Sequence, residues 1–153
     1  MVSHTFIYIL TFIITGLWDI VLRFLSENYD TLPKWIQWFK DPKILQPYFK
    51  HHTLLSAALL AGFVGAFAQF FILNIHKLPT NSKTFITFMI ITFIISGITG
   101  LLMQYSKLFP ILSETYYKQL GKIKGFYHDG ISGLIAQINV LTVLYFIKNF
   151  ISI

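Results

Sequence analysis

Four long stretches of this chain are apolar and almost free of charge, and they limit what the chain can fold into. About 20 apolar residues in a helix cross the hydrocarbon core of a bilayer, and an ionised group at its centre costs about 2.5 kcal/mol or more. Only the first stretch holds charged residues, Asp19 and Arg23. The pattern therefore predicts four transmembrane helices, at about 5–24, 53–75, 84–106 and 130–147.

The composition excludes the main soluble alternatives. Hydrophobic residues make up 55% of the chain and charged residues 12%, whereas a soluble domain carries about a quarter charged residues. The chain has no cysteine, which excludes a secreted disulfide scaffold. The first stretch is not predicted to be a cleaved signal peptide, because it lacks a basic start and Trp18-Asp19 lies where small residues should precede cleavage.

The basic residues predict an orientation. An even number of spans places both termini on one side, and Lys and Arg accumulate in cytoplasmic loops. Lys77, Lys83 and Lys148 lie in the short connection and the tail, and the other nine of the twelve lie in or beside the two long connections. Both long loops are therefore expected in the cytoplasm and both termini outside it. The membrane itself is not identified, and an internal virion membrane is one candidate.

Each long connection is predicted to contain a short amphipathic helix. In the first, Leu32, Trp35, Ile36 and Phe39 recur at helical spacing, and in the second Pro110 opens a similar run. Such a helix settles at a headgroup boundary, docks a partner, or simply packs over the bundle mouth. The residues expected to contact the membrane interface or a partner are Lys34, Trp35, Trp38, Lys40 and Lys43.

The sequence also suggests an internal duplication, with copies at 5–75 and 84–150. Thr11–Gly16 in the first span resembles Thr92–Gly97 in the third, and each is followed by a basic, proline-containing loop with a histidine near its end. Two helical hairpins related by an axis along the membrane normal would account for this similarity. The alternative is chance, because apolar helices resemble one another.

Small and polar residues form a narrow stripe on every span. Residues at positions 0, 3 and 7 of a helix lie on one face. Lipid gives apolar helices no hydrophobic incentive to associate, so close approach at glycine and hydrogen bonds from buried amides hold them together. The stripes, which also predict the packing faces, are Gly16, Asp19 and Arg23; Gly62, Gly65 and Gln69; Gly97, Gly100 and Gln104; and Gly130, Gly133 and Gln137. Several alanines widen the second stripe, so the second helix is expected at the centre of the bundle.

The same stripes allow a functional interpretation. Intramembrane polar residues often line a route for a solute or ion, and Gln69, Gln104, Gln137 and Asn139 would line it here. The packing interpretation is favoured, because a buried amide can bond to a neighbouring helix. Asp19 and Arg23 are four residues apart and are expected to neutralise each other.

Catalysis is not predicted. His52, His128 and Asp129 are expected at one membrane level and are weak candidates for metal ligands. The chain carries no recognised catalytic, nucleotide-binding or channel-filter motif, so no catalytic residue and no cofactor is expected. The net charge of +6 is divided between loops that border the bilayer, which indicates lipid attraction and not nucleic-acid binding.

Three segments resemble uncharacterised four-span membrane proteins of large DNA viruses. They are Gly16–Arg23, His52–Ala58 and Gly125–Leu134. The resemblance implies a component of a viral internal membrane and carries no mechanism.

A second, partial resemblance is to the four-span channel family of peroxisomal and mitochondrial inner membranes. It rests on Asp19-Ile20, Thr53-Leu54, Gly62–Gly65 and Pro79. Where that family continues with a proline, a histidine and a Trp-Tyr pair, this chain has Ala66–Phe71. The family's pore function is therefore not carried over to this chain.

The sequence thus predicts an all-α membrane protein, with four transmembrane helices forming two hairpins in one bundle. Its expected role is non-catalytic and structural: it organises a bilayer and docks neighbouring membrane or capsid-type proteins, or further copies of itself, through the basic loops. The first alternative is a channel or carrier for a small solute or ion. The second is a membrane-embedded, metal-dependent enzyme.

Overall fold

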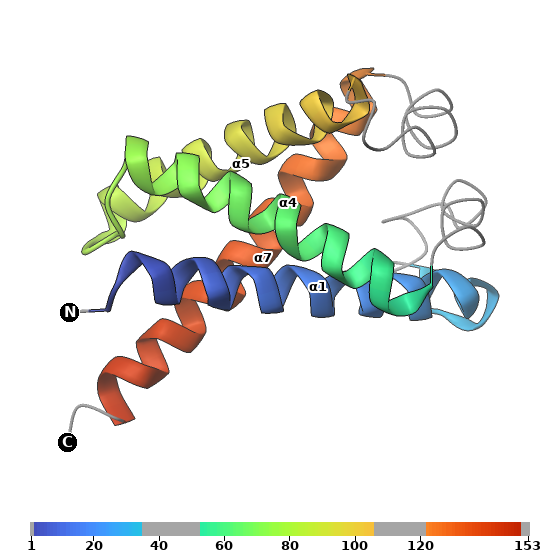
Figure 1. Ribbon diagram of the computed structural model, residues 1–153, viewed down its shortest axis with the longest axis horizontal. Helices are drawn as coiled ribbons and strands as arrows, with labels where there is room; N and C mark the ends of the chain where they lie inside the picture. The colour runs from blue at the N-terminus through green and yellow to red at the C-terminus, as the bar shows by residue number, and fades with distance from the viewer. Residues whose placement is uncertain (1, 35–52, 106–121, 151–153) are drawn as a thin grey trace.

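The computed structural model describes residues 2–34, 53–105 and 122–150, and these residues form helices without any strand. The four-helix membrane architecture predicted from the sequence is confirmed (Figure 1). The predicted amphipathic helices of the two long loops lie mainly outside the described residues. The helices are α1 (His4–Glu27), η1 (Tyr29–Thr31), α4 (Leu54–Ile75), α5 (Ser82–Tyr105) and α7 (Lys122–Phe150).

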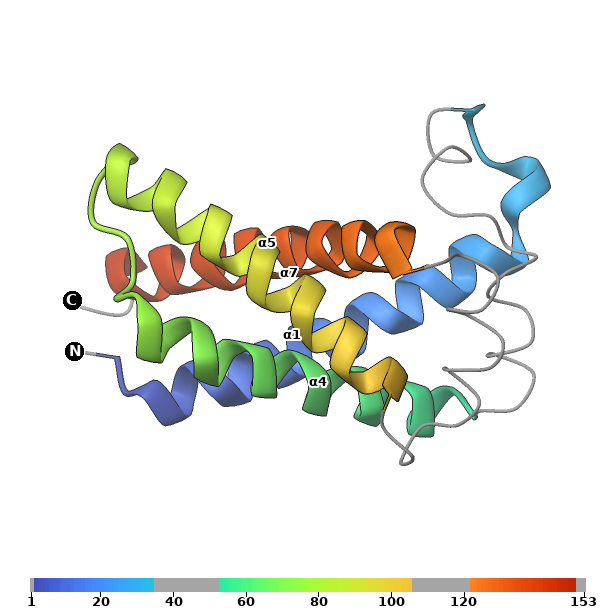
Figure 2. The same cartoon turned by 90° about the horizontal axis from the view of Figure 1, so that it is seen from above.

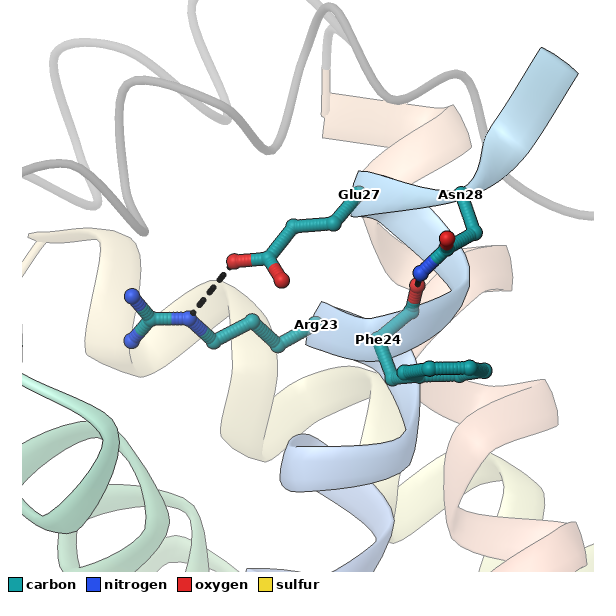
Figure 3. A network of polar contacts seen from close by, with 4 residues as sticks. All are labelled: Arg23, Phe24, Glu27 and Asn28. Carbon is teal, nitrogen blue, oxygen red and sulfur yellow. Dashed lines mark hydrogen bonds and ion pairs between the residues drawn. The ribbon is translucent and has the colours of Figure 1, made fainter.

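Side-chain caps fix where three of the long helices begin. The oxygens of Ser3, Thr53 and Asn81 each accept a hydrogen bond from the backbone N–H three residues later, at 2.9–3.2 Å. The first turn of a helix leaves backbone donors without intrahelical partners, and these caps satisfy one donor in each case. At the other end of α1, both the backbone and the side-chain N–H groups of Asn28 donate to the Phe24 carbonyl (Figure 3).

The four helices form two hairpins. Helix α1 packs mainly against α4, and α5 packs mainly against α7, while α4–α5 and α1–α7 contacts join the two hairpins. Both termini lie at one end of the bundle, as four spans require (Figures 1 and 2). Toward the other end, where α1 ends and α4 begins, the α5–α7 hairpin diverges from the α1–α4 hairpin (Figure 1).

The outer surface of the bundle is apolar. Leu55, Phe63, Ile86 and Tyr145 are each at least 60% exposed, and large apolar side chains are exposed on all four helices. Only 22–28% of each membrane span is buried inside the bundle. Exposing so large an apolar surface to water is unfavourable, whereas lipid tails solvate it. The chain is therefore an integral membrane protein.

The best-packed part of the core lies toward the end that carries the termini. It consists of Ile7, Ile72, Leu73, Phe88, Val140 and Leu144, which come from all four helices. The expectation that the second span lies at the centre of the bundle is wrong, because α4 packs against α1 and α5, and each of the four helices likewise has two main neighbours. Glycines let α4 approach α1 closely, but no helix is surrounded by the other three.

Candidate functional site

The glycines of the first hairpin let two helix backbones approach each other. A Cβ atom built at Gly16 would lie 2.9 Å from the carbonyl oxygen of Ala58, and one built at Gly62 would lie 2.9 Å from that of Phe12. A Cβ at Gly65 would collide with the side chain of Thr15. The small residues of α1 and α4 therefore face each other, and van der Waals contact between backbones holds this pair together.

The second hairpin is packed through the same kind of contact. A Cβ atom at Gly97 would lie 2.6 Å from the ring of Phe126, and one at Gly130 would lie 2.6 Å from the ring of Phe93. These two rings meet edge to face, with centroids 5.7 Å apart. Gly133 lies against Ser96 in the same interface. Gly97 and Gly130 thus make room for aromatic rings. In the first hairpin Gly16 makes room for the backbone of α4, and Gly62 makes room for both the backbone and the ring of Phe12.

The contacts of the two hairpins correspond residue by residue. Phe12, Thr15 and Gly16 on α1 have the spacing of Phe93, Ser96 and Gly97 on α5, and Ala58, Gly62 and Gly65 on α4 have that of Phe126, Gly130 and Gly133 on α7. In the first hairpin, Phe12 contacts Gly62, Thr15 contacts Gly65, and Gly16 contacts Ala58. In the second hairpin, the equivalent contacts are Phe93 with Gly130, Ser96 with Gly133, and Gly97 with Phe126. The two hairpins thus share one packing scheme.

A carboxylate also lies in the second interface. A Cβ atom at Gly100 would collide with the carboxylate of Asp129, so the glycine leaves room for this acidic side chain near the end of α7 that faces the long connections. The position that corresponds to Gly100 in the first hairpin is Asp19 on α1, and the position that corresponds to Asp129 is Ala61 on α4. Each hairpin therefore has one acidic residue at this level, carried by a different helix.

Four buried polar residues lie beside the apolar core. Ile7, Ile72, Phe88 and Val140, which we call the apolar layer, supply one residue from each helix and are at most 2% exposed. One helical turn from each, toward the long connections, stands a polar residue that is at most 4% exposed. These residues, which we call the polar layer, are Thr11, Gln69, Thr92 and Gln137.

Three polar atoms of this layer lack a hydrogen-bond partner within the described part of the chain. They are Gln69 Nε2, Gln137 Nε2 and Thr92 Oγ1. By contrast, the hydroxyl of Thr11 donates to the Ile7 carbonyl at 2.8 Å. Most buried polar groups in proteins are paired with protein or with ordered water. Three unpaired atoms in one layer therefore mark this layer as the candidate site.

Asn139 does not belong to this layer. It lies on the exposed face of α7, and its side-chain amide donates to the Ile135 carbonyl of the same helix at 2.8 Å. Two residues along a helix correspond to about 200° of rotation, so Asn139 and Gln137 face in nearly opposite directions. A route lined by both residues is therefore wrong for this helix. The side chain of Gln104, in the last turn of α5, is outside the described part of the chain.

Arg23 forms an ion pair in the last turn of α1. Its Nε donates to Glu27 Oε1 at 3.2 Å (Figure 3), a partner that the sequence spacing also permits. The glutamate side chain is 61% exposed, so water screens the pair and it contributes little to stability. Asp19 is partly buried one turn earlier on the same helix.

Most of the remaining predicted site residues lie outside the part of the chain that the structure describes. Lys34 is exposed at the edge of the described residues, whereas Trp35, Trp38, Lys40, Lys43 and His52 lie beyond it. His128 belongs to α7, but its side chain is not described. Among the described residues, no group of three or more His, Asp or Glu side chains could hold a metal ion.

Thr11 and Thr92 are site residues that spacing arguments missed. They open the two similar segments that suggested a duplication, but neither belongs to a glycine stripe. The sequence signal that points to them is that they occupy equivalent positions in the two similar segments.

Comparison of the chain with protein-family models, with curated proteins and with solved structures gives no match.

Proposed function

We propose that this protein is a non-catalytic structural component of a membrane. The apolar layer carries the proposal: one nearly inaccessible side chain from each helix closes the interior near the end that bears the termini. A closed interior is not the geometry of an open pore, which needs a continuous polar route. The exposed apolar faces of all four helices leave ample area for lipid or for neighbouring membrane proteins.

The proposed docking elements are the basic loops. Lys34 is exposed where the first long connection leaves the bundle, and Trp35, Trp38, Lys40 and Lys43 follow it in the sequence. Lysines beside a bilayer attract anionic headgroups, and tryptophan prefers the membrane boundary. We propose that these residues bind a neighbouring protein layer or a further copy of the chain, with both long loops in the cytoplasm.

A second candidate function is a gated path for a small solute or ion. The unpaired amides of Gln69 and Gln137 favour it, because polar groups within a membrane often mark a route. The apolar layer would then have to open during transport.

Flux through reconstituted liposomes separates the two candidates. A structural component adds no leak of potassium, chloride or glycerol above that of empty vesicles, whereas flux that disappears in a Gln69→Leu, Gln137→Leu variant would overturn the structural proposal. Cross-linking in the native membrane tests docking. Replacing Lys34, Lys40 and Lys43 with alanine should reduce cross-linked partners. The Lys77→Ala, Lys83→Ala control, which alters basic residues in the short connection and in the first turn of α5, should not.

A further inference from the structure

The polar layer has hydrogen-bonding capacity that the described residues do not satisfy. Gln69 and Gln137 are 1% and 2% exposed, Thr92 is 1% exposed, and each has an unpaired polar atom. Leaving buried donors unpaired is costly, and in native proteins ordered water commonly satisfies them.

The register of the helices places these side chains at one level. Ile7, Ile72, Phe88 and Val140 belong to a single packed cluster. Moving one turn toward the long connections leads from Ile72 to Gln69 on α4 and from Val140 to Gln137 on α7. The same step leads from Phe88 to Thr92 on α5. The three unpaired atoms are therefore carried by neighbouring helices at the same depth.

The chemistry of the layer selects a neutral occupant. An amide N–H needs an acceptor, whereas a threonine hydroxyl can donate or accept. A chloride ion would accept from all three groups, but the four residues of the layer are uncharged, and an unpaired ion deep in a membrane is costly. A water molecule accepts two hydrogen bonds, donates two and carries no charge.

We propose that the polar layer is a hydration site, in which water bound between the two hairpins accepts hydrogen bonds from Gln69 and Gln137 and contacts the hydroxyl of Thr92. The apolar layer closes the terminal side. This inference goes beyond the proposed function, because a structural component has no need of internal water and a bound water does not make a pore.

Water-edited solid-state NMR of the full chain in lipid bilayers tests the proposal. The chain contains two Ala-Gln pairs, Ala68-Gln69 and Ala136-Gln137. Labelling alanine carbonyls with ¹³C and glutamine uniformly with ¹³C and ¹⁵N therefore selects the backbone nitrogens of these two glutamines without any substitution. Carbon–carbon transfer along each glutamine then identifies its side-chain amide. Asn139, labelled in a second sample, is the matched control, because its amide lies in the same span but on the exposed face.

Bound water predicts that the side-chain amides of Gln69 and Gln137 gain polarisation from water several-fold faster than the amide of Asn139. Build-up as slow as that of Asn139 would overturn the proposal, because the layer would then be dry. Replacing chloride with bromide in the buffer should leave the two glutamine signals unmoved. A bromide-dependent shift of these signals would also overturn the proposal, because it would identify an anion as the occupant.

Discussion

Gly16 and Gly97 occupy corresponding positions in the two hairpins, but an added methyl group meets different obstacles at each. At Gly16 the new Cβ lies 2.9 Å from a backbone carbonyl oxygen of α4, which moves only if the whole helix moves. At Gly97 it lies 2.6 Å from the ring of Phe126, and a side chain can change its torsion angles. Gly16→Ala should therefore lower the free energy of unfolding more than Gly97→Ala.

The expected magnitudes follow from two opposing effects. Overpacking a well-packed interface costs about 1–3 kcal/mol, and replacing glycine with alanine inside a helix recovers about 0.5–1 kcal/mol. Gly16→Ala should thus lower the free energy of unfolding by about 0.5–2 kcal/mol. Gly97→Ala should lie within about 0.5 kcal/mol of the parent protein, because the ring of Phe126 can move aside.

Steric-trap unfolding in bicelles measures both free energies under conditions that keep the helices in lipid. Circular dichroism of each variant provides the control that helix content is unchanged. Equal destabilisation by the two substitutions would refute the argument that backbone and side-chain obstacles differ. A neutral Gly16→Ala would refute the close backbone contact itself.

Three further outcomes follow from the packing, all measured by the same unfolding assay. Phe88→Ala should lower the free energy of unfolding by about 3–5 kcal/mol, because it leaves a cavity in the apolar layer. Ile86→Ala, which changes a side chain that is 60% exposed, should lower it by under about 0.5 kcal/mol. Equal losses would contradict the assignment of the core. Asn139→Leu should leave the free energy of unfolding within about 0.5 kcal/mol of the parent, since within the described residues its amide donates only to its own helix, and a larger loss would mean that Asn139 contacts another helix. Glu27→Gln should cost less than about 1 kcal/mol, with the difference shrinking in high salt; a salt-independent loss would contradict a screened pair.

The spans and their packing faces could be predicted because the bilayer imposes simple rules. Charge is excluded from the hydrocarbon core. The predicted ends of the uncharged stretches therefore agree with the observed ends of most helices to within a few residues. Helix α7 is the exception, since it begins at Lys122, well before the predicted span. The aqueous boundary does not stop a helix, so charge alone could not locate that start.

The candidate site was harder to predict because it depends on the register between helices. Gln69 and Gln137 are amides in apolar segments and can be predicted from residue type, whereas the place of the two threonines depends on the packing of Ile7 against Phe88. Residue type alone places Asn139 with the glutamines, although its angular position on the helix separates it from Gln137. The angular position of a residue on its helix therefore predicts which face it occupies better than its residue type does.

Disulfide cross-linking tests the paired-hairpin architecture most directly, because the chain has no cysteine of its own. A Cβ atom at Gly65 would lie 2.8 Å from that of Thr15, so a small separation of the helices reaches the 3.5–4.5 Å that a disulfide needs. Thr15→Cys with Gly65→Cys, and Ser96→Cys with Gly133→Cys, should each cross-link within one chain in native membranes. The exchanged pairs, Thr15→Cys with Gly133→Cys and Ser96→Cys with Gly65→Cys, should not, and equally efficient cross-linking of the exchanged pairs would contradict the architecture.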